Sequence, residues 1–182
     1  MTRCSWVNLK NPLYIKYHDK EWGKPVYSDN QLFELLILES FQAGLSWECI
    51  LNKRTAFQEA FDHFDYQKIS CYQEEKVNSL LQNKNIVRNK LKIKAAIENA
   101  KVFGQITEEY QTFSNYIWHF TDNKIIYESG KTKSCLSDKI SKDLQKKGMK
   151  FVGSTIIYSY LQAIGVINSH EKTCFLYQRS NQ

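Results

Sequence analysis

Four residues with the chemistry of metal ligands lie near the two ends of the chain. Cys4 and His18 lie near the N-terminus, and His170 and Cys174, with three residues between them, lie near the C-terminus. The second spacing is typical of the second half of a zinc-finger site, and two Cys with two His complete a tetrahedral ligand set. Such a site has no open coordination position, so it would be structural and would join the termini. The alternative is four unrelated residues.

Aromatic residues are concentrated in the N-terminal part of the chain. Five fall within the first 27 residues and a sixth follows soon after: Trp6, Tyr14, Tyr17, Trp22, Tyr27 and Trp47. A pocket built from such rings can hold a flat ligand by stacking, and it favours a cationic one through cation–π attraction. Packing in an ordinary hydrophobic core is the alternative explanation.

One carboxylate, Glu39, occupies an unusual place in the sequence. It directly follows the apolar run Leu35–Leu38. A carboxylate buried there would need a hydrogen-bond donor or a cation as its partner. The alternative is an exposed glutamate on the polar face of a helix.

Two stretches of the chain hold much of its basic charge. These are Lys84, Arg88, Lys90, Lys92 and Lys94, and then Lys139, Lys142, Lys146, Lys147 and Lys150. Basic stripes attract phosphate backbones, although a solvated lysine face is the simpler explanation. The second stretch leads into a glycine-bounded hairpin, Gly148–Gly153. Glycine lets the backbone approach a phosphate, and the start of the next helix adds partial positive charge. An ordinary helical hairpin with a glycine stop remains the alternative.

The elements that must position these groups are mostly helical. Glycine and proline are scarce, and apolar residues recur at three- and four-residue steps. A capping box at Ser28–Gln31 predicts the start of the helix that carries Glu39. The tripeptide Ala43–Leu45 interrupts that helix, and Ser46 can cap the next one.

Further helices are predicted after residue 85, among them two short ones around 108–113 and 115–120. A long basic helix over 86–103 would stop at Gly104. Residues 121–134 are predicted to be a loop or a short hairpin. Helices over 137–144 and 154–165 would flank the glycine-bounded turn, forming an element over about 137–165.

Length and composition limit the classes of protein that fit. The chain has 182 residues, a net charge of +6 and five cysteines, and 42% of its residues are hydrophobic. This excludes a wholly disordered chain, and the longest apolar run is far short of the ~20 residues that span a bilayer. Without an apolar signal segment we expect a soluble, cytoplasmic protein whose cysteines are thiols or metal ligands.

Taken together, these motifs resemble the 3-methyladenine DNA glycosylase I family, constitutive bacterial enzymes of the helix-hairpin-helix glycosylase superfamily. The resemblance runs nearly end to end, and the central block is the most specific part. The motifs that carry it are Arg3–Trp6, Pro12–Ile15, Tyr17–Gly23, Leu38–Glu39, Gln42–Trp47, Lys150–Gly153 and His170.

The resemblance implies a role for each group. It implies a compact, mostly helical single domain over 1–182, with a structural zinc that joins segments 1–20 and 168–176. The zinc ligands would be Cys4, His18, His170 and Cys174. The pocket for the excised base would consist of Trp6, Tyr14, Tyr17, Trp22, Trp47 and the hydrogen-bonding Glu39. The DNA contacts would be a wedge of Gln42, Gly44 and Leu45, and the hairpin residues Gly148, Lys150, Gly153 and Ser154.

The resemblance also implies the chemistry, with two departures from the wider superfamily. The segment Gly165–Ser169 contains no aspartate, and this family is similar in lacking one. The segment Ser154–Tyr158 contains no lysine, so strand cleavage is not expected. The expected protein is a monomeric, monofunctional glycosylase that releases 3-methyladenine from alkylated duplex DNA.

Two other functions fit parts of the sequence. A non-catalytic DNA-binding protein could use the same hairpin and zinc site, although binding alone does not require Glu39 among aromatic rings. A zinc-dependent hydrolase is the weaker alternative, because four protein ligands leave no open position on the metal.

Overall fold

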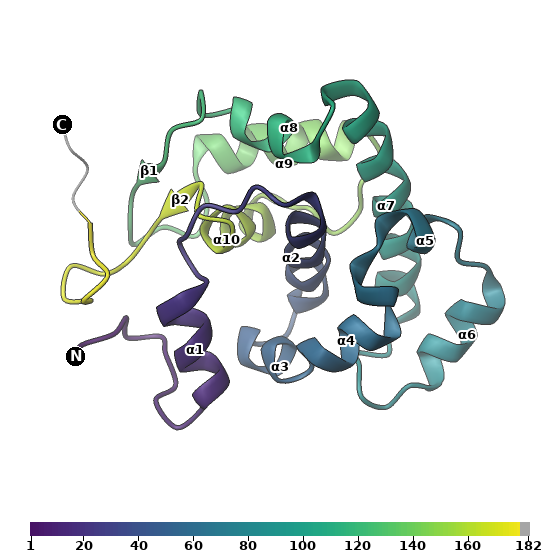
Figure 1. The fold of residues 1–182 in the computed structure, drawn as a ribbon, viewed down its shortest axis with the longest axis horizontal. Helices are drawn as coiled ribbons and strands as arrows, with labels where there is room; N and C mark the ends of the chain where they lie inside the picture. Colours follow the sequence, from purple (N-terminus) through teal and green to yellow (C-terminus); the bar gives the residue numbers. More distant parts are fainter. Residues whose placement is uncertain (179–182) are drawn as a thin grey trace.

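Helices make up most of the chain in the computed structural model, which describes residues 1–178 (Figure 1). The elements in chain order are α1 Pro12–Lys20, α2 Asp29–Gln42, α3 Trp47–Asn52, α4 Arg54–Ala60, η1 Asp62–Phe64, α5 Tyr66–Ser70, α6 Glu74–Gln82, α7 Lys90–Tyr110, α8 Phe113–His119, β1 Ile126–Tyr127, α9 Cys135–Lys146, α10 Ser154–Ala163 and β2 Ile167–Asn168. The mostly helical fold class predicted from the sequence is confirmed.

Helix α2 lies at the centre of the molecule. Figure 1 shows α2 and α10 in the middle, with α8 and α9 on one side and α3 and α4 on the other. Every residue from Leu32 to Phe41 is buried, and the Tyr160 hydroxyl of α10 donates to the Leu32 carbonyl at 3.1 Å. A helix covered on all sides leaves no solvent to satisfy its polar side chains, so each of them needs a partner within the protein.

The start of α2 was predicted correctly, but its expected capping box does not form. Ser28 is the N-cap residue, yet its side chain caps nothing. Asp29 instead accepts hydrogen bonds from the backbone N–H groups of Phe113 and Ser114, at 2.9 and 2.8 Å. The first acid of α2 therefore caps α8, a long-range contact that local spacing does not reveal. The Ser46 cap of α3 is confirmed, because its hydroxyl accepts from the Cys49 N–H at 3.2 Å.

The predicted stop of the long helix at Gly104 is wrong. Helix α7 begins after its N-cap Asn89 and continues to Tyr110, so Gly104 lies inside it. A Cβ at Gly104 would lie 3.6 Å from the ring of Tyr66. Packing of α5 against α7 explains a glycine there better than a helix end does, because the small residue lets the two helices approach.

The segment 121–134 does not form a hairpin of its own. Its strand β1 pairs in parallel with β2, in the register Ile126 with Ile167 and Tyr127 with Asn168. This pairing joins residues about forty positions apart, which explains why local patterning predicted only a loop. It places the segment that follows β1 beside the C-terminal part of the chain.

The predicted helical pair near the C-terminus is present with slightly different limits. Helix α9 begins at Cys135, two residues before the predicted start, because Ser134 and Ser137 form a capping box. Helix α10 begins directly after the turn that contains Gly148 and Gly153. The two helices pack against each other.

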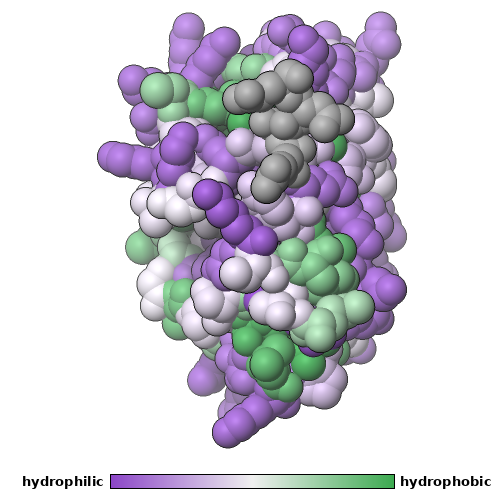
Figure 2. Space-filling view, turned by 90° about the vertical axis from the view of Figure 1, so that its left-hand side faces the viewer, coloured by the Kyte–Doolittle hydropathy of each residue, from purple (hydrophilic) through white to green (hydrophobic). Residues whose placement is uncertain are grey.

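The two termini of the described chain lie at the same end of the molecule, on the left in Figure 1. Figure 2 shows this end as small hydrophobic patches between hydrophilic side chains. Within residues 1–178, none of the helices has the length and apolar character that crossing a membrane requires.

At Gly165, which follows the end of α10, the backbone of the N-terminal segment packs very closely against the core. The φ of Gly165 is +74°, and a Cβ there would collide with the backbone of Lys24 and Pro25. Gly130 has the same φ of +74°, but a Cβ there would meet nothing within 4 Å. We expect Gly130→Ala to lower the free energy of unfolding by about 1 kcal/mol, which is the backbone term alone.

Gly165→Ala should lower the free energy of unfolding by more than about 3 kcal/mol, because a clash with the backbone of another segment is added to the strain of the positive φ. Urea unfolding of both variants measures the difference. Equal effects of the two substitutions would show that the 24–25 segment can move away from α10.

Candidate active site and metal site

A cavity of about 600 Å³ opens between the N-terminal aromatic residues and α2. Its walls come from α1, α2, α3, α10 and the segments that follow β1 and β2. All six residues expected to bind a base line this cavity: Trp6, Tyr14, Tyr17, Trp22, Glu39 and Trp47. Gln42, expected to belong to the wedge, lines it as well.

The aromatic walls are packed against one another. The ring centroids of Trp6 and Trp22 are 4.8 Å apart, and those of Trp6 and Tyr14 are 5.4 Å apart. Tyr17 and Trp47 form a further pair at 5.2 Å. Rings held by mutual contacts lose little freedom when a flat ligand enters, so the cavity is largely preformed.

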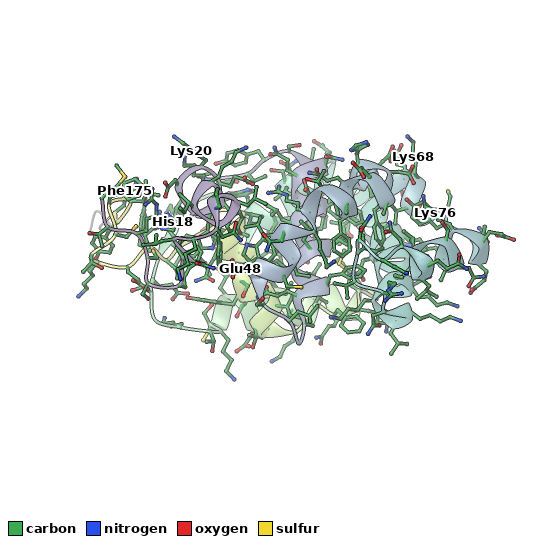
Figure 3. The ribbon with its side chains drawn as sticks, turned by 90° about the horizontal axis from the view of Figure 1, so that it is seen from below. His18, Lys20, Glu48, Lys68, Lys76 and Phe175 are labelled. Atoms are coloured by element: carbon green, nitrogen blue, oxygen red, sulfur yellow. The ribbon has the colours of Figure 1, made fainter. Side chains whose placement is uncertain are left out.

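Helices α1 and α3 are fixed relative to each other by Glu48. Its carboxylate accepts from the side-chain amides of Asn8 and Asn11, each at 2.8 Å. Asn11 is also the N-cap of α1 and accepts from the Leu13 N–H at 3.0 Å. Figure 3 shows Glu48 between the end of the molecule that holds His18 and the end that holds Lys68. This contact sets the spacing between the α1 and α3 walls of the cavity.

Two carboxylates of α2 are buried, and they differ in their partners. Glu34 accepts from Arg54 Nε and from Gln58 Nε2, both at 2.8 Å. Glu39 is 3% exposed and faces the cavity, and its Oε2 has no hydrogen-bond partner. The indole Nε1 of Trp47 is also buried without a partner. An acceptor and a donor left unsatisfied in one cavity indicate a ligand site, because such groups are costly in a core.

Burial raises the pKa values of two side chains of this cavity, Glu39 and Tyr17. It raises the pKa of Glu39 to about 8, so its carboxyl group is mostly neutral at pH 7. The pKa of Tyr17 is raised well above its usual value, first by burial and then by the nearby Glu39. A cation placed beside Glu39 would lower its pKa and restore the carboxylate. The cavity is therefore suited to a positively charged flat ring.

The expected wedge residues lie where α2 ends. The N–H of Leu45 donates to the Gln42 carbonyl at 2.6 Å, closing a tight turn in which Gly44 has φ +80°. Leu45 is 41% exposed, and a Cβ at Gly44 would meet nothing within 4 Å. Gln42 lines the cavity, whereas Gly44 and Leu45 are not among the residues that line it.

The hairpin between α9 and α10 is held by buried side chains that sequence reasoning missed. Asn99 of α7 accepts from the Lys150 N–H at 2.8 Å and donates to the Lys150 carbonyl at 2.9 Å. The Ser141 hydroxyl donates to the Val152 carbonyl at 2.7 Å. Gly148 has φ +108°, and no side chain caps the first turn of α10, which begins at Ser154. Uncapped N–H groups at a rigid helix start can hold an anion.

The first basic stretch is not the continuous stripe that the sequence predicts. Lys92 is 7% exposed, and its Nζ donates to backbone carbonyls rather than to solvent. Lys94 forms an ion pair with Glu74. In the second stretch Lys147 pairs with Glu109 at 2.9 Å. Spacing alone could not separate the buried lysine from the exposed ones, because both kinds lie on the same helix.

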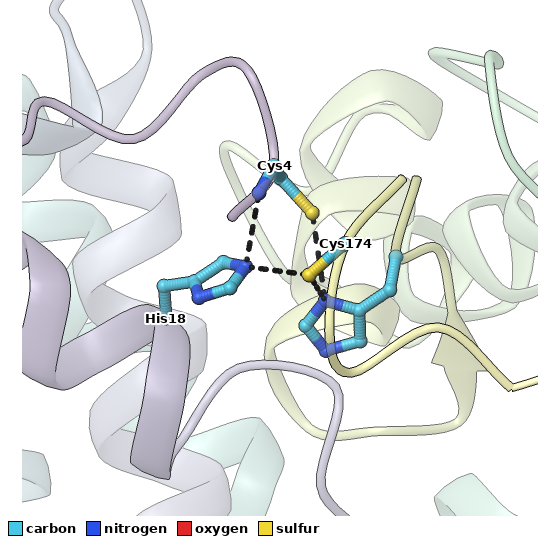
Figure 4. A group of neighbouring side chains, drawn as sticks. Cys4, His18 and Cys174 are labelled. Atoms are coloured by element: carbon cyan, nitrogen blue, oxygen red, sulfur yellow. Dashed lines mark hydrogen bonds between the residues drawn. The ribbon is translucent and has the colours of Figure 1, made fainter. Parts of the chain in front are cut away.

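The four candidate metal ligands lie together, with their ligand atoms all within 4.8 Å of one another, and Figure 4 shows Cys4, His18 and Cys174 of this group side by side. Cys4 Sγ lies 3.5 Å from His170 Nδ1, and Cys174 Sγ lies 3.5 Å from His18 Nε2 and 3.6 Å from His170 Nδ1. All four are buried. Ligands at zinc distances of about 2.0–2.3 Å in a tetrahedron are about 3.3–3.8 Å apart, so the donor set fits such an ion.

The surroundings of the four residues also fit a metal. His18 Nδ1 lies 2.8 Å from Asp19 Oδ1, which leaves Nε2 for the metal, and Arg3 Nη2 donates to the same carboxylate at 2.7 Å. Burial lowers the pKa of His170 to about 4, so its ring is neutral, the form that binds metals. The pKa of the Cys4 thiol is raised to about 12 by burial, so without a cation the thiolate is disfavoured.

Some residues of the site carry no signal in the sequence. Ser129, Gly130, Lys131, Ser159 and Gln162 also line the cavity. The segment 129–131 is placed there by the pairing of β1 with β2, which was not predicted. Asp19 could have been found, since it follows a histidine already proposed as a ligand.

Comparison with known proteins agrees with this geometry. The model of the methyladenine glycosylase family matches residues 6–177. The chain belongs to this family. It is 42% identical to DNA-3-methyladenine glycosylase 1 of Escherichia coli, over 97% of both chains. It is 38% identical to the DNA-3-methyladenine glycosylase of Haemophilus influenzae, over 95% of this chain and 96% of the relative.

Solved structures of methyladenine glycosylases share the whole fold. The 3-methyladenine DNA glycosylase I of Staphylococcus aureus, studied for 3-methyladenine recognition, superposes with a TM-score of 0.93. It is 34% identical, over 100% of this chain and 99% of that one. A variant of a 3-methyladenine DNA glycosylase I in complex with 3-methyladenine has the same TM-score at 33% identity, over 98% of this chain and 99% of that one. The family resemblance stated from the sequence is confirmed.

From the raised pKa of Glu39 we predict how the free energy of unfolding depends on pH. Its pKa is about 8 in the folded protein and near 4.5 in the unfolded chain, so the folded state holds a proton more tightly. Stability must then fall as the pH rises from about 4.5 through about 8, because the buried carboxyl group ionises. Between pH 6 and pH 9 the wild type should lose about 2.5 kcal/mol relative to Glu39→Gln, which cannot ionise.

Urea unfolding at the two pH values measures this difference. Glu98→Gln, at an exposed glutamate paired with Lys101, is the matched control and should follow the wild type. Parallel pH profiles for the wild type and Glu39→Gln would contradict a neutral, buried Glu39.

Proposed function

We propose that the protein is a monofunctional DNA glycosylase that hydrolyses the N-glycosidic bond of 3-methyladenine in alkylated duplex DNA, a step of base excision repair. The observation that carries this proposal is the unpartnered oxygen of Glu39 in a cavity walled by aromatic rings. A DNA-binding protein without catalysis has no need for such a costly group away from the DNA surface.

The chemistry that the enzyme must supply is modest. Methylation at N3 places positive charge on the adenine, so the base leaves as a neutral molecule when the bond from C1′ to the base breaks. Water adds to C1′ and its proton is released, leaving an abasic sugar in the strand. The protein has to extract the nucleotide from the stack, hold the base and admit that water.

The cavity distinguishes the methylated base by charge and by hydrogen bonding. Faces of Trp6, Tyr14 and Trp47 favour a cationic ring over neutral adenine. Glu39 accepts from the amino edge of the base, and the positive charge on the base favours its ionised form. The indole N–H of Trp47, which has no partner in the empty cavity, is a donor for a ring nitrogen. These groups act together on one flat, charged ligand.

Two further groups of residues are assigned to contacts with the duplex. We assign Gln42, Gly44 and Leu45 to the wedge that fills the gap left by the extracted nucleotide, which offsets an unstacking cost of a few kcal/mol. The α9–α10 pair is the proposed helix-hairpin-helix element. Gly148, Lys150 and Gly153 let its backbone approach a phosphate, and the uncapped N–H groups from Ser154 onward bind it.

The metal that the four ligands fit is a structural zinc ion. Cys4, His18, His170 and Cys174 would fill all four positions, so the ion would hold the two ends of the domain together and take no part in the reaction. This favours a glycosylase over a zinc-dependent hydrolase, whose metal needs an open position. We further propose that the chain acts as a cytoplasmic monomer and forms one domain over 1–182, of which residues 179–182 lie outside the described part of the structure. These last assignments remain predictions.

Release of free base tests the proposed activity. Purified protein with its metal bound should release 3-methyladenine from methylated duplex DNA and leave the strand uncut, as measured by chromatography of the bases and by gel analysis of the DNA. Glu39→Gln should lower the rate at least about tenfold, since it removes the buried carboxylate that is proposed to bind the base. Salt-sensitive DNA binding without base release would instead identify a non-catalytic DNA-binding protein.

Metal content tests the zinc assignment. Elemental analysis should find one zinc per chain. Cys174→Ser should lose the metal and several kcal/mol of stability, because metal binding is part of the folding free energy. Cys71→Ser, at an exposed thiol outside the ligand group, is the control and should retain both. A metal-free wild type of full stability would refute the assignment.

A further inference from the structure

Lys92 is the one buried lysine among the described residues, and it contacts the end of α2. It lies in the first turn of α7 and is 7% exposed. Its Nζ donates to the Phe41 carbonyl at 2.8 Å and to the Ala43 carbonyl at 2.5 Å. These two carbonyls belong to the residues on either side of Gln42.

Burial at this position is unfavourable for a lysine unless its hydrogen bonds compensate for the lost hydration. A buried ammonium group loses its hydration, and the first turn of a helix already carries partial positive charge. The ion pairs of residues 1–178 do not include Lys92, so no carboxylate compensates its charge. Its partners are carbonyls at the C-terminal end of α2, where the helix leaves carbonyls unpaired and carries partial negative charge.

The chain that Lys92 holds changes direction sharply. Ala43 ends α2 with an extended ψ of 113°, and Gly44 follows with φ +80°. The Leu45 N–H then donates to the Gln42 carbonyl. The turn is exposed at Leu45, and it has no side-chain packing at Gly44. Lys92 therefore supplies the side-chain contact that anchors this turn to α7.

We infer that Lys92 is a positioning residue for the extraction of the nucleotide from the duplex: its ammonium group fixes the carbonyls on both sides of Gln42 and so holds the turn that presents Leu45. This inference rests on the proposed function. Lys92 does not line the cavity, and it acts on DNA only through the turn.

Lys92 should therefore matter more for duplex DNA than for the base pocket, of whose lining only Gln42 lies next to the Lys92 contacts. Lys92 contacts α2 at the Phe41 carbonyl and the chain just after the helix at the Ala43 carbonyl, whereas Glu39 lies earlier in the buried part of the helix. A single strand has no partner base to displace and little stacking to break, so it depends less on a rigid wedge. The ratio of base release from duplex to release from single-stranded DNA is the sensitive quantity.

The experiment compares Lys92→Met with Lys101→Met, an exposed lysine of the same helix that pairs with Glu98. Release of 3-methyladenine is measured on methylated duplex and single-stranded DNA. For Lys92→Met we expect at least a tenfold loss on duplex DNA, at most a threefold loss on single strands, and a threefold or smaller change in affinity for free 3-methyladenine. Lys101→Met should match the wild type on both, and Lys92→Arg, which keeps a cationic donor, should recover part of the ratio.

The duplex-to-single-strand ratio does not depend on the fraction of folded protein, so a partly unfolded variant still gives a valid result. Lys92→Gln gives a second neutral variant in case Lys92→Met does not fold. A ratio unchanged from the wild type, whether or not both rates fall, would overturn the inference and leave the proposed function intact. Failure of the wild type to release base from either DNA would refute the proposed function itself. In a double-mutant cycle, Leu45→Ala should have a smaller effect in Lys92→Met than in the wild type.

Discussion

The burial of α2 from Leu32 to Phe41 is the constraint on which the rest of this structure depends. A helix with apolar packing on every side cannot leave its polar groups to solvent, so each of them has to find a partner in the protein. Glu34 finds Arg54 and Gln58, and the carbonyls at the end of the helix find Lys92. Glu39 alone keeps an unpartnered carboxylate oxygen. The same burial that stabilises the fold therefore creates a site whose missing partner is a ligand.

The proposed metal site and the aromatic cavity are mechanically connected. His18 and Tyr17 are neighbours on α1, and the ring of Trp6 lies 5.3 Å from His18. On the other side Trp22 packs edge-on against His170 at 4.7 Å. A metal that fixes the two histidines also fixes the aromatic walls that contact them. A structural ion would in this way support recognition without contacting the base.

Much of the site could be predicted from residue types, but the long-range contacts that position its residues could not. The Cys/His group, the aromatic cluster and Glu39 are chemically distinctive and lie together as expected. The long-range contacts that position them leave no local pattern: Asp29 capping α8, Asn99 bonding Lys150, and β1 pairing with β2. Lys92 was assigned to a surface stripe because spacing does not reveal which lysine of a helix is buried.

The central claim is that Glu39 makes the cavity selective for 3-methyladenine over adenine. The most direct test is the affinity of the free protein for 3-methyladenine relative to adenine, followed by the fluorescence of the cavity tryptophans, in the wild type and in Glu39→Gln. The account predicts a strong preference for 3-methyladenine in the wild type that falls toward equal affinity in the variant. An undiminished preference in Glu39→Gln would show that the aromatic walls alone select the base, and would contradict the role given to the buried carboxylate.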